Sequence, residues 1–341
     1  MALSDYHSSA LDWRGQLQRN QRKTQAVIVC FVLIYLCLGF LTDMLLLQYL
    51  YPGLPIGQAF NALVSFHAIP YATLSMVGVA IVSLLVTYSM YDRIMLMGTD
   101  YHEITPETAE TLQERQLYNV VEEMKVSSGL KFMPRVFIIE ANYMNAFASG
   151  YSEKSAMVAI TRGLIEKLDR AELQAVMAHE LSHIRHLDIK LTLMVGILSN
   201  VLLILIDVLF YSIVYGRERR EDSRLLVVIV LLRYVLPLIT LMLALFLSRT
   251  REFMADSGAV ELMRDNIPMA RALMKISQDH EKNAEEYSEE YGNTAHEEVR
   301  QASYLFDPSS LNPVRTLNNL FSTHPSLDQR LKALGFTKKG D

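Results

Sequence analysis

Cysteine is scarce in this chain of 341 residues, which contains only Cys30 and Cys37, both within the first long apolar run. Thiols in such runs usually behave as small buried hydrophobes. The pair therefore predicts neither a disulfide framework nor a cysteine-ligated metal. Any metal ion in this protein would have to be bound by histidine and carboxylate side chains.

Charge is also scarce, because only 20% of the residues are charged while 51% are hydrophobic. This balance is too apolar for an ordinary soluble protein and predicts partial embedding in a lipid bilayer. The net charge of -5, with no cluster of Lys and Arg among aromatic residues, argues against a nucleic-acid partner. No G-x-x-x-x-G-K-[ST] motif is present, so the sequence predicts no ATP site.

Four apolar runs are long enough to be predicted as transmembrane helices. They cover roughly residues 26–47, 62–90, 189–215 and 225–247. The first run follows a basic N-terminal segment and has no small-residue cleavage site after it, which predicts a signal anchor. The loop 51–61 contains no Lys or Arg, so the positive-inside rule places the N-terminus and everything after residue 92 in the cytoplasm.

The last two apolar runs flank a loop, residues 217–224, that carries four arginines and would lie outside the cell if both runs span. This conflicts with the positive-inside rule. We favour spanning, and the sequence leaves open whether 189–248 crosses the bilayer fully. Asp207 and Arg233 stand at similar distances from the loop centre. An antiparallel hairpin would pair them at one depth, and the alternative is that each snorkels separately.

A soluble segment lies between the second and third apolar runs. Thr105 before Pro106 predicts the start of an amphipathic helix over 106–125. Residues 135–140 and 156–161 are predicted strands, separated by a segment that contains 145–150. Asp169 with Glu172 three residues later forms a capping box pattern, which predicts a further helix from about residue 170.

That further helix carries the sequence His179-Glu180-Leu181-Ser182-His183. Two histidines four residues apart lie on one helical face, so both imidazoles can reach a single zinc ion. Glu180 is then placed to take a proton from water, as the catalytic base of a metallopeptidase. The pattern also occurs by chance in unrelated helices, so it requires a third ligand.

Glu252 is the predicted third ligand, and it follows directly after the last apolar run. Asp256 lies one helical turn further on, where it can accept a hydrogen bond from the second ring nitrogen of a ligating histidine. Glu252 is distant in sequence from His183, but an antiparallel membrane hairpin would return the chain to the face that it left.

These motifs together resemble the HtpX family of bacterial inner-membrane zinc metallopeptidases, which are relatives of the CAAX prenyl endopeptidases. The matching pieces come in family order and, with the apolar runs, cover nearly the whole chain. They are N-A-F at 145–147, HELSH followed by Asp188, R-E-x-x-A-D at 251–256, and Thr323-His324-Pro325 with Arg330.

The resemblance implies an α-helical membrane protein with a catalytic domain of the zincin-like α+β class, similar to thermolysin. This domain would contain a small sheet and the HExxH helix. The resemblance also implies one Zn2+ per chain and a role in quality control and stress response, with damaged, unfolded or misassembled membrane proteins cleaved at cytoplasmic sites. By resemblance to the N-A-x-aromatic edge strand of related peptidases, Asn145, with Ala146 and Phe147, would bind substrate backbone laid alongside as an added strand. The alternative is that Asn145 is an ordinary turn residue. His324 would stabilise the oxyanion or hold substrate, or else cap the following helix. Arg330 would brace Asp256 or a ligand, or else be an exposed helical arginine.

We therefore predict a multi-pass protein of the bacterial inner membrane with both termini and the active site in the cytoplasm. Its predicted parts are an N-terminal segment (1–25), two transmembrane helices (26–91), the first catalytic part (92–188), a transmembrane hairpin (189–248) and the second catalytic part (249–341). Substrate proteins and the lipid bilayer are the predicted partners. Assembly into membrane protease complexes or a homo-oligomer stays open.

Two other functions are compatible with parts of this sequence. In an intramembrane zinc protease, Asp207 rather than Glu252 would be the third ligand. In a catalytically silent membrane adaptor, Glu180 would have no role. The acidic stretch 279–298 is more typical of a solvated helix or mobile loop than of a docking surface. No role is predicted for His186, Asp188 or His280.

Overall fold

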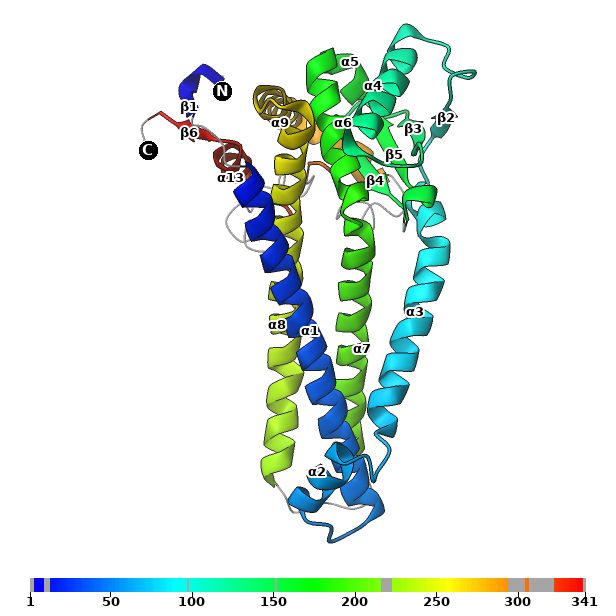
Figure 1. The fold of residues 1–341 in the computed structure, drawn as a ribbon, viewed down its shortest axis with the longest axis vertical. Helices are drawn as coiled ribbons and strands as arrows, with labels where there is room; N and C mark the ends of the chain where they lie inside the picture. The colour runs from blue at the N-terminus through cyan, green and yellow to red at the C-terminus, as the bar shows by residue number, and fades with distance from the viewer. Residues whose placement is uncertain are drawn as a thin grey trace. The chain divides into compact units, whose positions relative to one another are not determined.

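The computed structural model describes residues 3–8, 13–96, 98–150, 152–215, 223–293, 304–306 and 322–339. The fold is mostly helical with a small mixed sheet (Figure 1). The chain divides into two compact units. We call Gln25–Ser89 with Thr192–Ala244 the helical unit, and Met1–Thr24, Met90–Leu191 and Leu245–Asp341 the mixed unit.

Within the described residues, five helices contribute to the helical unit, some of them only in part. They are α1 (Trp13–Leu50), α2 (Ile56–Val64), α3 (Tyr71–Leu96), α7 (Asp188–Tyr215) and α8 (Ser223–Met263). A buried apolar cluster joins α1, α3, α7 and α8 through residues that include Tyr35, Met76, Leu202 and Leu236. The outward faces carry large exposed apolar side chains such as Leu33, which suits contact with lipid rather than water.

Three helical stretches in the described part of the chain are long and apolar enough to cross a membrane: Arg14–Leu50, Met194–Tyr211 and Val227–Met263. The predicted run 62–90 is wrong in its bounds. Helix α2 ends at Val64, and α3 begins only at Tyr71. Pro70, directly before α3, has no backbone N–H and therefore cannot continue a helix from the residues before it. Within α3, Tyr71–Ser83 is a shorter apolar stretch, so the fourth span stays a prediction.

Two polar contacts within the helical unit satisfy charged side chains among apolar neighbours. The Asp43 carboxylate accepts hydrogen bonds from the backbone N–H groups of Ala72 and Thr73, at 2.7 and 3.0 Å, and so satisfies donors in the first turn of α3. The predicted pairing of Asp207 with Arg233 is confirmed, with 2.9 Å between Arg233 Nε and Asp207 Oδ1. The arginine-bearing loop between these helices lies outside the described residues at 216–222.

A four-stranded sheet in the order β2-β3-β5-β4 forms one layer of the mixed unit. Its strands are β2 (Tyr101–Ile104), β3 (Arg135–Ile139), β4 (Ala146–Ser149) and β5 (Met157–Thr161). Only β3 and β5 run parallel; β2 pairs antiparallel with β3, and β4 antiparallel with β5, with Phe147 opposite Ala159. The predictions for β3 and β5 are confirmed to within one residue. Residue patterning alone predicted only a connecting segment at β4, because its four buried residues show no polar alternation; the edge strand there was expected only from the family resemblance.

Within the described residues, the mixed unit also contains α4 (Leu112–Ser128), α5 (Arg162–Lys167), α6 (Arg170–Arg185), α9 (Ile267–Lys282), α10 (Ala284–Asn293) and α13 (Leu327–Ala333). The predicted start at Pro106 is wrong. Thr105 caps a turn after β2 by accepting from Thr108 N, while Thr111 and Glu114 form the capping box that begins α4. Short 3-10 turns cover Leu3–Asp5 and Glu153–Ser155, and β1 (Tyr6–Ser8) pairs antiparallel with β6 (Phe336–Lys338).

Helix α6 packs against α4, α9 and β4, so it lies at the centre of the mixed unit (Figure 1). Its first turn has the capping box predicted from Asp169 and Glu172. The helix ends at Arg185, because His186 is the C-cap and Leu187 adopts a left-handed φ of 53°. Helix α7 begins at Asp188, so α6 and α7 are separate helices.

Helix α6 also meets the last turns of α8, where Gly258 faces Ser182. A Cβ added at Gly258 would lie 2.4 Å from Ser182 Oγ and 2.9 Å from Ser182 Cβ. Glycine at this position therefore permits the close approach of α8 to α6.

We expect Gly258→Ala to lower the free energy of unfolding by about 1–3 kcal/mol, the usual range for overpacking a buried contact. Adding Ser182→Gly removes both clashing atoms, so the double variant should lose less stability than the sum of the single losses. Chemical denaturation of the purified protein measures these changes. Gly196→Ala is the matched control, because nothing lies within 4 Å of its added Cβ. Equal stability of Gly258→Ala and the control would contradict the packing argument.

Candidate metal centre

His179 and His183 lie one turn apart on α6 and direct their Nε2 atoms toward the same point. The two Nε2 atoms are 3.1 Å apart, and the rings stand nearly perpendicular at a centroid distance of 4.8 Å. His179 is fully buried. This arrangement follows from the spacing of four residues, which places both side chains on one face.

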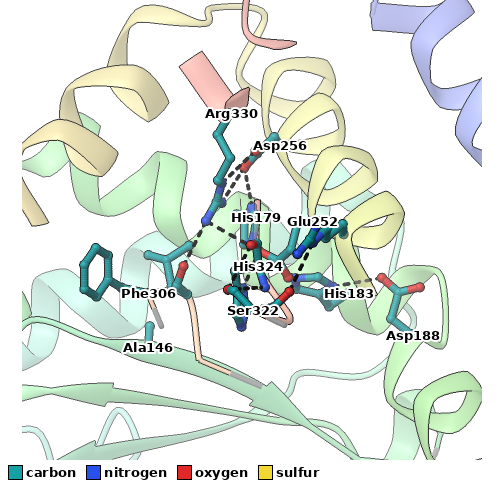
Figure 2. Close-up of polar contacts among 12 residues, drawn as sticks. Ala146, His179, His183, Asp188, Glu252, Asp256, Phe306, Ser322, His324 and Arg330 are labelled. Atoms are coloured by element: carbon teal, nitrogen blue, oxygen red, sulfur yellow. Dashed lines mark hydrogen bonds and ion pairs between the residues drawn. The ribbon is translucent and has the colours of Figure 1, made fainter. Parts of the chain in front are cut away.

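Glu252 reaches the two imidazoles from α8, as predicted from its position after the last apolar run (Figure 2). Its Oε1 lies 3.5 Å from His183 Nε2, and its Oε2 lies 3.7 Å from His179 Nε2. One ligand atom from each of the three residues falls within 4.8 Å of the others. Two imidazoles and one carboxylate fit a catalytic metal that keeps a fourth position for water or substrate, the ligand set typical of zinc peptidases.

A carboxylate contacts the outer nitrogen of each imidazole. His179 Nδ1 lies 3.0 Å from Asp256 Oδ1, and His183 Nδ1 lies 2.8 Å from Asp188 Oδ2. A proton held on Nδ1 by these carboxylates leaves Nε2 as the metal-binding lone pair. The contact from Asp256 matches its predicted role. Asp188 was given no role, because its side chain reaches His183 only through the left-handed turn at Leu187 between α6 and α7.

Two arginines hold the outer carboxylates in place. Arg330 on α13 donates to both oxygens of Asp256, from Nε at 2.9 Å and from Nη2 at 2.6 Å. Its Nη1 lies 3.4 Å from Glu252 Oε2. Arg251 Nε lies 3.2 Å from Asp188 Oδ1. The structure therefore places Arg330 as a buried brace of Asp256, not as an exposed helical arginine.

Glu180 is buried beside the metal ligands, and neither of its carboxyl oxygens makes a hydrogen bond of normal geometry with the described residues. Burial raises the pKa of Glu180 to about 7, against the opposing effects of nearby His183 and the backbone of Ala148. A carboxyl group with a pKa near neutrality can both accept and return a proton at physiological pH.

The two ligating histidines differ in their affinity for protons. Burial lowers the pKa of His179, which favours the neutral, ligand-competent imidazole. Burial also disfavours charge at His183, but the neighbouring carboxylates of Asp188 and Glu252 outweigh it and raise the pKa of that imidazole. A metal binding here therefore competes with a proton mainly at His183.

His324 approaches the same centre from the loop before α13. Its Nδ1 lies 3.3 Å from Glu252 Oε2, and the ring is buried. Ser322 holds the loop, because its Oγ accepts from His324 N and donates to His324 O. His186, in contrast, is the C-cap of α6 and is outside the His179, His183 and Glu252 group.

The predicted substrate strand, Asn145 to Phe147, lies at the edge of the sheet formed by β4. The Asn145 amide forms a fork, with Nδ2 donating to Phe306 O at 3.0 Å and Oδ1 accepting from Phe306 N at 3.2 Å. Ala146 O accepts from Leu305 N at 2.9 Å. Phe147 is fully buried and packs its ring on Tyr304. The backbone partner of this edge is thus a segment of the chain itself.

Two residues that sequence reasoning missed fix the orientation of the Asn145 amide. His280 Nδ1 lies 2.9 Å from Ile276 O, which requires the proton on Nδ1 and leaves Nε2 as an acceptor. Tyr291 OH lies 3.2 Å from His280 Nε2 and 3.1 Å from Asn145 Nδ2. The tyrosine therefore donates to His280 and accepts from Asn145. No role was predicted for His280, because the three residues are far apart in sequence and no pattern relates them.

Comparison with protein families matches residues 111–337 of this chain to "Peptidase family M48". Among curated proteins, one named "Protease HtpX homolog" from Helicobacter acinonychis is 40% identical over 318 residues, covering 93% of this chain and 96% of that protein. Proteins of the same name from Dictyoglomus thermophilum and Bacteroides fragilis are 33% and 30% identical, and they cover 80% and 94% of this chain.

Among solved structures, the crystal structure of S. mikatae Ste24p aligns with a TM-score of 0.47 at 19% identity. The alignment covers 87% of this chain and 66% of that chain, so this chain spans slightly less than two thirds of its length.

Removing the charge that holds His183 should weaken metal binding without removing a ligand. We expect Asp188→Asn to bind metal about 10–100-fold more weakly, the usual effect of losing such an outer hydrogen bond. Competition with a chelator measures this affinity. The control is Glu261→Gln, which changes a carboxylate that pairs with α6 at Arg185, at 3.2 Å, away from the metal ligands. Affinity within twofold of wild type would refute the role of Asp188.

Proposed function

Because this chain belongs to peptidase family M48, and within it to the HtpX proteases, we propose that it is a zinc-dependent endopeptidase acting on membrane proteins. Membership makes the chain a membrane metallopeptidase. The observation that carries the proposal is the convergence of His179, His183 and Glu252 beside the buried carboxyl group of Glu180.

Zinc is the metal that best suits this ligand set of two imidazoles and one carboxylate. Carboxylates on the outer nitrogens and a neighbouring carboxyl group of raised pKa are further features of catalytic zinc sites. When bound, zinc supplies Lewis acidity that polarises a peptide carbonyl and acidifies water.

Glu180 supplies the proton transfers in this mechanism. Its carboxylate takes a proton from the attacking water and afterwards gives it to the leaving amine, which requires a pKa close to the operating pH. The raised pKa of about 7 meets that requirement. His324 Nδ1 and Arg330 Nη1 lie 3.3 and 3.4 Å from Glu252 Oε2, and we propose that these two side chains stabilise negative charge on the carbonyl oxygen.

Asn145 and Ala146 would bind the substrate backbone. The side-chain amide of Asn145 and the backbone carbonyl of Ala146 can hydrogen-bond to the main chain of a peptide rather than to its side chains. They therefore suit an extended, unfolded segment. This supports damaged or misassembled membrane proteins as substrates, in a quality-control and stress-response role. The absence of a P-loop motif from the sequence means that unfolding by ATP hydrolysis would need a partner protein.

The alternative of an intramembrane protease with Asp207 as third ligand is less well supported. Asp207 is paired with Arg233 at 2.9 Å, and Glu252 already lies within 3.7 Å of both imidazole Nε2 atoms. A silent adaptor has no use for a buried carboxyl group such as that of Glu180, which makes no hydrogen bond of normal geometry with the described residues, because burying such a group costs free energy.

We expect Glu180→Gln to keep about one zinc per chain and to lose about 10²–10⁴-fold in cleavage of an unfolded model substrate, the range for a lost general base. Glu252→Ala should instead lose most of its zinc, because two imidazoles remain. Metal analysis and fragment release from the detergent-purified chain measure both.

Glu166→Gln is the control for charge removal, because Glu166 is exposed on α5. If Glu180→Gln cuts as fast as wild type, the catalytic assignment is wrong. Full zinc retention by Glu252→Ala would instead move the third ligand to another residue.

We also propose that the chain is a bacterial inner-membrane protein with the mixed unit in the cytoplasm. The support is the basic N-terminal segment and the uncharged loop 51–61. The bacterial origin of the related proteases agrees with this location.

Single-cysteine labelling tests this orientation after Cys30 and Cys37 are changed to serine. Val126→Cys, on an exposed position of α4, should react with a membrane-impermeant maleimide only after the membrane is opened. Gln58→Cys, on an exposed position of α2, should react in intact cells. The reverse pattern would place the mixed unit outside.

A further inference from the structure

The strand edge that would bind substrate already contacts three residues of the same chain. Strand β4 stands at the end of the sheet order, with β5 on its inner side. On its other edge Leu305 N donates to Ala146 O at 2.9 Å, and Phe306 bonds through both its N–H and its carbonyl to the Asn145 amide. Residues 304–306 thus add to the sheet as an extended peptide would.

This segment also bonds to a side chain that contacts a metal ligand. Arg330 Nη1 donates to Leu305 O at 2.9 Å. The same nitrogen lies 3.4 Å from Glu252 Oε2 (Figure 2). A single guanidinium nitrogen therefore joins the Leu305 carbonyl to the proposed third ligand. A substrate lying across the metal centre would need the same strand edge, amide and guanidinium.

Two side chains of the segment, Tyr304 and Leu305, are buried, and the third, Phe306, is half-buried. Tyr304 is 1% exposed, and its ring lies 5.7 Å from that of Phe147 and 6.0 Å from that of Tyr291. Leu305 is 2% exposed. Phe306 stacks on the His280 ring at 4.2 Å between centroids. The surroundings therefore suit an aromatic residue, an aliphatic residue and a second aromatic residue, in that order.

Residues outside the segment 304–306 fix which atom of the Asn145 amide donates and which accepts a hydrogen bond. His280 and Tyr291 hold the Asn145 amide with Nδ2 as donor and Oδ1 as acceptor. This orientation presents one donor and one acceptor side by side, which is the pattern needed by the C=O and N–H groups of a single residue in an extended peptide.

We propose that residues 304–306 are an internal occupant of a peptide-binding edge formed by β4 and the Asn145 amide, and that substrates with an extended aromatic–aliphatic–aromatic segment bind by displacing them. The proposal rests on the peptidase function above and adds its substrate class and its regulation. Both occupants need the same donors and acceptors, so the edge binds one at a time. The apparent affinity for substrate then equals the intrinsic affinity multiplied by the fraction of molecules in which the edge is free.

The test measures binding of a fluorescent acetyl-Tyr-Leu-Phe-amide peptide to the full chain in detergent. All variants carry Glu180→Gln, so that the peptide is not cut. Leu305→Pro removes the N–H that pairs with Ala146 O, and Phe306→Ala removes the stacking on His280. Each should bind the probe about fivefold more tightly than the parent, because losing one hydrogen bond or ring contact weakens the internal competitor.

Two controls test whether the change in probe affinity arises at the β4 edge. Phe132→Ala removes an aromatic ring that is 48% exposed and should leave probe affinity unchanged. A probe with an N-methylated leucine lacks the N–H for Ala146 O and should bind about fivefold more weakly. Saturating unmodified probe should also speed hydrogen exchange at the amides of residues 304–306, because displacement exposes them to water.

Probe affinities for Leu305→Pro and Phe306→Ala no higher than for the parent would overturn the proposal and make residues 304–306 a permanent strand of the fold. Unchanged hydrogen exchange at these residues under saturating probe would do the same. Neither probe binding nor hydrogen exchange requires zinc chemistry or turnover. The displacement proposal can therefore be wrong for an active peptidase, and it can be right for a chain that has no peptidase activity.

Discussion

The buried pair between Arg330 and Asp256 is the interaction on which the rest of the site depends. It joins α13 to α8, and through Asp256 it reaches His179 on α6. The remaining guanidinium nitrogen contacts Glu252 Oε2 and Leu305 O. Breaking a buried ion pair leaves one uncompensated charge, at a cost of about 3–5 kcal/mol. The pair therefore restricts where the ligands can lie.

Helix geometry and capping patterns were enough to predict those site residues that lie close together in the sequence. The capping box at Asp169 and the spacing of four residues place His179 and His183 on one helical face before any tertiary contact is considered. Glu252 and Asp256 follow the same logic, since one helical turn separates them. Both pairs were predictable because helix geometry alone fixes which side chains lie together.

The parts that escaped prediction depend on backbone irregularities and on contacts between distant residues. Asp188 reaches His183 only because Leu187 adopts a left-handed conformation, which a β-branched or bulky residue rarely does. His280, Tyr291 and Asn145 come from three separate segments, and no periodicity relates them. Strand β4 is so short and so buried that it lacks the alternation by which strands are recognised. Family resemblance supplied Asn145 where periodicity could not.

In the proposed function, the same arrangement would explain how a strand edge that recognises peptide backbone without selectivity avoids unselective cleavage. An exposed strand edge with a fixed amide fork would pair with many extended segments. Here Leu305 and Phe306 already satisfy Ala146 and Asn145, so an incoming peptide gains only the difference between its own contacts and theirs. A polar segment would forfeit the apolar contacts that Tyr304 and Leu305 make. Only an apolar extended segment offers comparable burial, and unfolded parts of membrane proteins have that composition.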